Sequence, residues 1–379
     1  MYPHRIRLHG PWDYEPLART VLHADGRLEV IDGPLPPRGR MTVPGRWADR
    51  GPGAFAGRMR FRRTFQWPAG LDFCERLWLV FAGADYFTTV RLNGELLGRH
   101  EGAFDPFAFD ISALVQLRNE LTVEVDLPAV PPETLDRQRM VRGSSACPTA
   151  SGGLWGSVAL EVRREAFLRG VRLEATFADP APMLRVAGEV AGTSDRPLEV
   201  YITLDGETVR EGRVEARPEG SPFELSAPVP SAECWRPSPR GRPRLYEAAV
   251  HLIDPASKLD TQVRRIGFRV PGAGPREPAD PVDLMEPVAA GEQFGPADEA
   301  GAPRWVCLPF RGGYADDDRV RAEAVRQARA IVAALAHHPS IAGWVCHRDP
   351  REHDAALDRE LCAAVRALDP TRPCVAGGG

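Results

Sequence analysis

Short runs of alternating apolar and polar residues, separated by Gly, Pro and Asn, cover the first 270 residues of the chain. Such runs are typical of antiparallel β-structure. In residues 88–98, Asn93-Gly94 stands between two apolar runs and predicts a tight type I′ hairpin. Residues 119–127 alternate in the same way and predict another strand. About eight such runs in residues 1–163 predict a sandwich of the jelly-roll type.

A second group of runs follows in residues 164–270. Their number and their spacing of roughly 12–20 residues predict an immunoglobulin-like β-sandwich. The expected strands lie near 171–177, 183–190, 198–204, 223–229, 245–253 and 262–270. Residues 271–303 then lose all periodicity and are rich in Pro, Gly, Ala and acidic residues. This composition predicts a linker or a loop-rich seam.

The hydrophobic period changes again in residues 304–379. An apolar run at 305–308 precedes a helix that we expect to begin at the acids 316–318 and to reach His337. Its apolar face holds Val320, Ala324, Ala328, Ile331, Val332 and Leu335. A buried strand, a second helix and another apolar start follow at 340–346, at about 352–368 and at 373–376. This order is typical of parallel βα units. The expected fold is therefore multidomain and mainly β, with a jelly-roll sandwich, an immunoglobulin-like β-sandwich and a partial α/β segment.

Length and charge narrow the function classes. The chain has 379 residues and a mass of 41.6 kDa, so about two or three domains are expected. The net charge of −4 shows no basic surplus, which argues against nucleic acid as a partner. No apolar run approaches the roughly 18 residues of a membrane-spanning helix. The first eight residues lack the order of a secretory signal, so a cytoplasmic location is expected.

The sequence offers no recognisable metal or cofactor motif. Seven cysteines are scattered without any Cys-x-x-Cys pair, so buried free thiols are expected rather than a disulfide framework or a zinc knuckle. His337 and His338 are adjacent near a helix end, which favours helix capping over a metal site because adjacent side chains project to different sides. No phosphate-binding loop, nucleophile-elbow serine or dinucleotide fingerprint is present. We therefore expect no metal and no cofactor.

One polar cluster stands where position alone suggests a site. His347-Arg348-Asp349 directly follows the buried strand at 340–346, and catalytic groups of α/β barrels lie at the carboxyl ends of strands. Asp349 would serve as a general acid there, and His347 would form a hydrogen bond with substrate. The alternative is that Asp349-Pro350 is a turn leading into the next helix, with Arg348 as its surface salt-bridge partner. Spacing alone favours this alternative.

An aromatic series in the first sandwich also has two interpretations. Flat rings match the apolar faces of sugars, so the series is a candidate stacking platform. A sandwich core needs large apolar residues as well, and filling the core is the favoured interpretation. The series comprises Phe81, Tyr86, Phe87, Phe104, Phe107 and Phe109.

Several segments, taken in order, resemble glycoside hydrolase family 2, the β-galactosidase, β-mannosidase and β-glucuronidase group. Segments similar to its sugar-binding jelly roll are Val43-Pro44-Gly45-Arg46-Trp47, Phe61-Arg62-Arg63-Thr64-Phe65, Val90-Arg91-Leu92-Asn93-Gly94, Gly98-Arg99-His100-Glu101-Gly102, Phe104-Asp105-Pro106-Phe107 with Asp110-Ile111, and Gly152-Gly153-Leu154-Trp155. Leu245-Tyr246 and Arg265-Ile266-Gly267-Phe268-Arg269 resemble the end of its immunoglobulin-like domain. His338-Pro339-Ser340-Ile341 with Trp344, and Asp369-Pro370-Thr371-Arg372-Pro373, resemble its TIM-barrel catalytic domain.

The resemblance implies a site as well as a fold. Trp344, His347 and Arg348 are the expected substrate-binding residues, and Asp349 occupies the acid/base position. The family carries Asn-Glu where this chain has Arg348-Asp349. A carboxylate one methylene shorter beside a fixed cation is expected to stay ionised and to be a poor acid. The 109 residues after Val270 are fewer than the roughly 250 of a full barrel, and we expect the family's nucleophile to be absent.

Three functions are compatible with these features. The favoured one is a pseudo-glycosidase of carbohydrate metabolism that binds a carbohydrate, such as a β-glycoside or oligosaccharide, without cleaving it. The second is an active retaining β-glycosidase, if the chain is a fragment or if a partner completes the barrel. The third is a structural or assembly module. No nucleic acid or membrane partner is expected, and the sequence leaves a homo-oligomer open.

Overall fold

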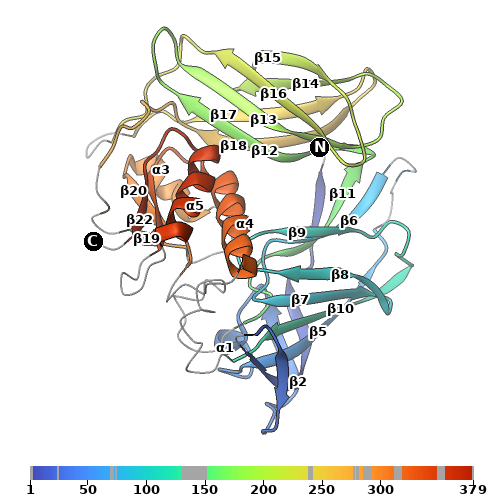
Figure 1. Cartoon of the computed structure of the whole chain (residues 1–379). Helices are drawn as coiled ribbons and strands as arrows, with labels where there is room; N and C mark the ends of the chain where they lie inside the picture. The colour runs from blue at the N-terminus through green and yellow to red at the C-terminus, as the bar shows by residue number, and fades with distance from the viewer. Residues whose placement is uncertain are drawn as a thin grey trace.

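Two antiparallel sheets form the first part of the molecule (Figure 1). The structure, a computed structural model, describes residues 3–23, 25–68, 72, 75–129, 152–237, 242–275, 278, 281–284, 292–310, 318–347 and 355–377. One sheet has the order β1 (His4–Arg7), β11 (Val158–Arg164), β6 (Glu75–Phe81) and β9 (Phe107–Asp110). The other has the order β3 (Leu28–Ile31), β2 (Gly10–Leu22), β5 (Gly57–Gln66), β10 (Arg118–Leu127), β7 (Phe87–Leu92) and β8 (Glu95–Glu101). In addition, β4 (Gly39–Val43) pairs with β2 and precedes the short helix α1 (Trp47–Arg50).

The β7–β8 connection confirms the predicted hairpin. Asn93 and Gly94 have φ angles of 54° and 90°, the two positive values that a type I′ turn requires. The Asn93 side chain also ties the turn to β10, since its Oδ1 accepts the Glu120 N–H at 2.9 Å. Local turn chemistry therefore sets the register of two neighbouring strand pairs.

Alternate side chains fill the core between these sheets. Leu121, Val123 and Val125 of β10 are fully buried, as their two-residue period predicts. The aromatic series belongs to the same core: Phe81, Tyr86 and Phe104 are buried within it, and Phe87, Phe107 and Phe109 pack against it. The core-filling interpretation therefore accounts for the aromatic series.

Two further antiparallel sheets follow along the chain and lie at the top of Figure 1. The first has the order β12 (Ala166–Thr176), β13 (Met183–Gly192) and β16 (Ser221–Pro228). The second has the order β15 (Glu207–Val214), β14 (Leu198–Leu204), β17 (Tyr246–Ile253) and β18 (Lys258–Ile266). The six predicted strands are all present. Sequence reasoning missed β15, although the Asp205-Gly206 turn before it, with φ angles of 49° and 89°, is a hairpin signal of the same type as Asn93-Gly94.

The last part of the chain forms a parallel sheet in the order β19 (Val282–Asp283), β20 (Arg304–Cys307), β21 (Ile341–His347) and β22 (Cys374–Gly377). Helix α4 (Asp318–Leu335) connects β20 to β21, and α5 (Ala355–Leu368) connects β21 to β22. These are the βα units that the sequence predicts, and their membership of a TIM-like barrel stays a prediction. Of the predicted apolar face of α4, Ala324, Ala328, Ile331, Val332 and Leu335 are fully buried, and the side chain of Val320 lies outside the described residues.

The segment 271–303, expected as a linker or a loop-rich seam, contains regular structure in its described part. It contributes β19, the 3-10 helix η2 (Glu292–Phe294) and helix α3 (Gly295–Ala300). Phe294 is buried in the same apolar cluster as the first sandwich and the α4 face, so packing rather than local pattern orders this stretch. Across the ranges given above, no helix is long and apolar enough to cross a membrane.

Candidate functional site

The predicted site lies at the carboxyl end of β21. This strand runs between β20 and β22, and its residues 341–346 are all buried. Its last residue, His347, pairs in register with Gly377 of β22. Because parallel strands end at one common edge, β21 ends at the edge where open α/β sheets bind ligands. Arg348 and Asp349, and the side chain of His347, lie outside the described residues.

Trp344 lies in the interior of the sheet. Its side chain is fully buried, and its indole Nε1–H donates a hydrogen bond of 2.8 Å to Asp369 Oδ2. An indole without exposed surface has no face on which a sugar can stack. The burial therefore favours a structural role over the substrate contact that the resemblance implies.

Asp369 is the centre of a buried polar network. Its carboxylate accepts hydrogen bonds from Arg372 Nη1 at 2.7 Å and from Thr371 Oγ1 at 2.7 Å, in addition to Trp344. Burial raises the pKa of this carboxyl, but the charge of Arg372 and the three hydrogen bonds outweigh it and hold the pKa below its usual value. Arg372 also donates to the carbonyl oxygens of Ala336, His338 and Ile341. The Asp-Pro-Thr-Arg motif thus fastens β21 to the end of α4.

A second acid that sequence reasoning missed holds the start of β21. Asp298 of α3 accepts the His338 Nδ1–H at 2.6 Å and the Ser340 N–H at 2.9 Å. His338 therefore pairs with a carboxylate 40 residues away, whereas the neighbouring His337 forms a hydrogen bond with the Ala334 backbone in the last turn of α4. Asp298 lies in the irregular segment 271–303, where no local pattern distinguishes it from its neighbouring acids.

The first sandwich is joined to α4 by another ion pair. Arg326 Nη1 donates to Asp105 Oδ2 at 2.6 Å, and Nη2 donates to the Glu101 carbonyl at 2.7 Å. His100 lies 3.5 Å from the other Asp105 oxygen and stacks on Phe107. Burial raises the pKa of Asp105, but hydrogen bonds and charges from His100 and Arg326 outweigh this effect, so the pKa lies below its usual value. Two of the motifs that resemble the jelly roll, at residues 98–102 and 104–107, thus bind helix α4 of the α/β segment.

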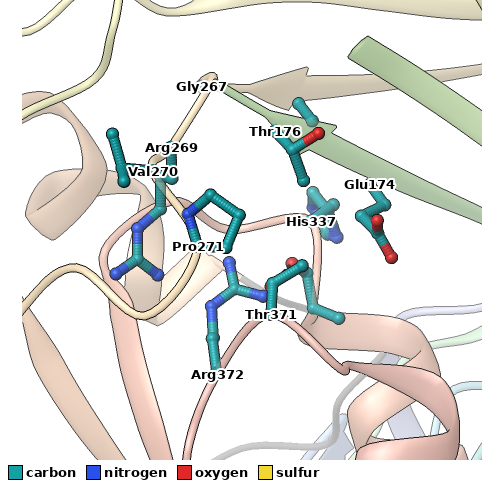
Figure 2. Close-up of a pocket in the computed structure, with 11 residues that line it drawn as sticks. Glu174, Thr176, Gly267, Arg269, Val270, Pro271, His337, Thr371 and Arg372 are labelled. Atoms are coloured by element: carbon teal, nitrogen blue, oxygen red, sulfur yellow. Dashed lines mark hydrogen bonds between the residues drawn. The ribbon is translucent and has the colours of Figure 1, made fainter. Parts of the chain in front are cut away.

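A small hollow of about 20 Å³ lies between the second sandwich and the end of helix α4 (Figure 2). Arg269 and Arg372 both line it, together with Glu174 of β12. Burial, reinforced by the charge of Arg372, lowers the pKa of Arg269 to about 9. The Arg269 guanidinium donates to the carbonyl oxygens of Ile341 and Ala273. Since backbone carbonyls occupy these donors, the hollow is better explained as a seam between domains than as a sugar site.

Comparisons with known proteins agree with this architecture. Residues 56–166 match the family model of the glycosyl hydrolase 2 galactose-binding domain-like domain. A β-glucuronidase from Bacteroides fragilis is 23% identical over 367 residues, covering 79% of this chain and 51% of the relative. A β-galactosidase from Thermoanaerobacter pseudethanolicus is 23% identical over 206 residues, covering 52% of this chain and 26% of the relative.

Solved structures match almost the whole chain. A GH2 β-galacturonidase from Eisenbergiella tayi superposes with a TM-score of 0.74 at 19% identity, covering 98% of this chain and 70% of that one. A β-glucuronidase from Bifidobacterium dentium, complexed with coumarin-3-O-glucuronide, gives a TM-score of 0.70 at 20% identity, covering 99% of this chain and 75% of that one.

The family model, the relatives and the shared fold thus all show similarity to glycoside hydrolase family 2, a family of glycosidases of carbohydrate metabolism. This confirms the resemblance seen in the sequence motifs. The chain spans about half the length of the B. fragilis relative and about a quarter of the T. pseudethanolicus one.

Proposed function

We propose that the chain binds a β-glycoside at the carboxyl end of β21 and that the 379-residue polypeptide does not hydrolyse it. The observation that carries the proposal is the position of β21, a buried strand with a parallel neighbour on each side that leads directly into His347-Arg348-Asp349. In the family that the chain resembles, the same place in the sequence carries the catalytic acid. Asp298 holds Ser340, just before the strand, and Asp369 holds Trp344 in the middle of the strand, which fits a scaffold that positions a ligand site.

The proposed lack of hydrolysis rests on the acids themselves. Arg348 beside Asp349 favours an ionised carboxylate, which cannot protonate a leaving group. Retaining glycosidases also need a second carboxyl about 5–5.5 Å from the first. Asp369, which contacts β21 through Trp344, is buried and bound to Arg372 as well, so it is not free to act as that nucleophile.

The substrate class follows from Arg348 and from the relatives. Solved relatives include a β-galacturonidase bound to galacturonate and a β-glucuronidase complexed with a glucuronide. A guanidinium binds a carboxylate through two parallel hydrogen bonds, which a neutral sugar cannot accept in the same way. We infer that this chain prefers β-linked uronides to neutral β-glycosides.

Calorimetry and a turnover assay test this function on the same protein. The probes are the p-nitrophenyl β-glucuronide, β-galacturonide, β-galactoside and β-mannoside. We expect binding of the uronides, weaker binding after Arg348→Gln, and p-nitrophenol release no faster than in buffer. Turnover would establish the active glycosidase instead. Binding of none of the four probes would favour the assembly module.

A repair experiment tests whether the altered acid position is the only defect or whether a nucleophile is missing as well. Arg348→Asn with Asp349→Glu restores the family pattern at the acid position. General acid assistance contributes typically 10²–10⁴-fold, but the retaining mechanism also needs a nucleophile. We therefore expect the double variant of the 379-residue chain to remain inactive. Hydrolysis by it would show that a second carboxylate serves as nucleophile and would contradict the proposal.

A further inference from the structure

Three cysteines from three different elements meet inside the parallel unit. Cys346 lies near the end of β21, Cys362 in α5 and Cys374 at the start of β22. Their Sγ atoms are 3.4 Å apart for Cys346 and Cys362, 3.6 Å for Cys346 and Cys374, and 3.0 Å for Cys362 and Cys374. All three are buried, and we call them the cysteine triad. It is the single group of three or more potential metal ligands among the described residues.

The triad differs from the other two described cysteines. The thiols of Cys234 and Cys307 each lie within hydrogen-bond distance of the next residue's carbonyl oxygen, at 3.5 Å and 3.4 Å. Single thiols of this kind behave as small apolar side chains. In the triad, each sulfur instead has the other two as neighbours. Three sulfur ligands that converge on one point form a soft donor set.

We propose that the cysteine triad binds one thiophilic divalent cation, of which Zn²⁺ is the biological representative. Soft thiolate ligands select zinc and similar ions over hard cations. With metal–sulfur bonds of about 2.3 Å, the sulfurs of a tetrahedral site lie about 3.8 Å apart. The triad reaches this spacing if its sulfurs separate by less than about 1 Å. Three protein ligands leave the fourth coordination position to water.

Binding of the cation changes the charge of the site. One Zn²⁺ displaces three thiol protons and leaves a net charge of −1 on the metal with its three thiolates. Arg366 of α5 is a cation near this site, since its Nη2 donates a hydrogen bond of 3.2 Å to the Cys374 carbonyl oxygen.

The main competing chemistry is a disulfide. Cys362 and Cys374 are free, and their 3.0 Å separation exceeds the S–S bond length of about 2.05 Å. A disulfide between them would remove two ligands from the site. A bound cation would instead fasten β21, α5 and β22 together, directly behind the strand end that carries His347.

Cadmium is a spectroscopic probe for this site, because Cd²⁺ bound to thiolates absorbs in the ultraviolet by charge transfer. The reduced full-length chain is titrated with Cd²⁺ and then with Zn²⁺. We expect an absorption band that saturates at one equivalent and disappears as Zn²⁺ displaces Cd²⁺. Cys362→Ala should lose the band. Cys307→Ala, a buried cysteine of the neighbouring strand, should keep it and serves as the matched control.

Alkylation of the unmodified chain gives a second measurement that does not depend on the folding of a variant. Mass spectrometry should show that Zn²⁺ slows alkylation of Cys362 and Cys374 but leaves Cys234 unchanged. The proposal is overturned if wild-type protein shows no band at one equivalent. An equal loss of the absorption band in Cys362→Ala and Cys307→Ala would overturn it as well. So would a Cys362–Cys374 disulfide that persists in the reduced chain without metal binding.

Discussion

Removing the Asp369 carboxylate is the sharpest test of how β21 is held. In Asp369→Ala, the Trp344 indole N–H loses its acceptor and Arg372 loses its counter-ion inside the protein. The side chains of Arg372 and Asp369 are only 8% and 2% exposed, so water does not replace the lost partner. Breaking a buried ion pair by removing one member costs about 3–5 kcal/mol. We expect a loss of this size in the local stability of the parallel unit.

The measurement must report on that unit, because a chain of several units does not unfold in one two-state step. Native-state hydrogen exchange of β21 and β22 peptides is suitable, since the Trp344 amide bonds the Pro373 carbonyl across these strands. A loss of 3–5 kcal/mol corresponds to exchange faster by roughly a hundredfold to several thousandfold. Peptides of the second sandwich, such as β14, should change little.

Glu299→Gln is the matched control. Glu299 pairs with Arg265 at 2.5 Å, but the two side chains are 51% and 57% exposed. Exposed pairs contribute about 0–1 kcal/mol, so exchange in β21 should stay within about tenfold of the wild-type rate. If Asp369→Ala changes exchange no more than this control, the buried network does not support β21 and the structural argument for the site fails.

Three other predictions concern the packing of the α/β segment. Arg326→Ala should destabilise the contact between α4 and the first sandwich by about 2–3 kcal/mol, since it leaves the buried Asp105 with fewer partners. Thermal melting should show this loss. Substitution of the exposed Arg329 by Ala on the same helix should leave the stability nearly unchanged. The pKa of Asp105 is held below 3.8 in the folded state. The stabilising contribution of Asp105 is therefore present above pH 3.8 and is lost as the pH falls through the lower folded pKa. The free energy of unfolding should depend less steeply on acidic pH in Arg326→Ala than in the wild type, and an unchanged slope would contradict this role of Asp105. Gly343→Ala places a Cβ about 2.5 Å from the Trp305 ring and should cost about 1–3 kcal/mol through overpacking; a variant as stable as wild type in urea would show that this ring moves freely.

Local chemistry explains why much of the β-structure could be predicted from the sequence. A type I′ turn needs two residues that tolerate positive φ, and Asn93-Gly94 supplies them without help from distant residues. A two-residue apolar period likewise fixes which face of β10 is buried. The same turn chemistry was present at Asp205-Gly206, so β15 was missed by interpretation and not because information was lacking.

The contacts that shape the candidate site depend on the tertiary structure. Asp298 and His338 are 40 residues apart, and Arg326 and Asp105 are 221 apart, so no sequence period relates either pair. Seven scattered cysteines without a short-range pair predicted only isolated thiols, because cysteine spacing reveals a site only when the ligands are close in sequence. Parallel strands that end at one edge, with helices folded back over them, bring Cys346, Cys362 and Cys374 together. The sequence determined the strands, the turns and the resemblance to glycoside hydrolase family 2. The long-range packing of the βα units decided which acids are paired, that Trp344 is buried and where the sulfur atoms meet.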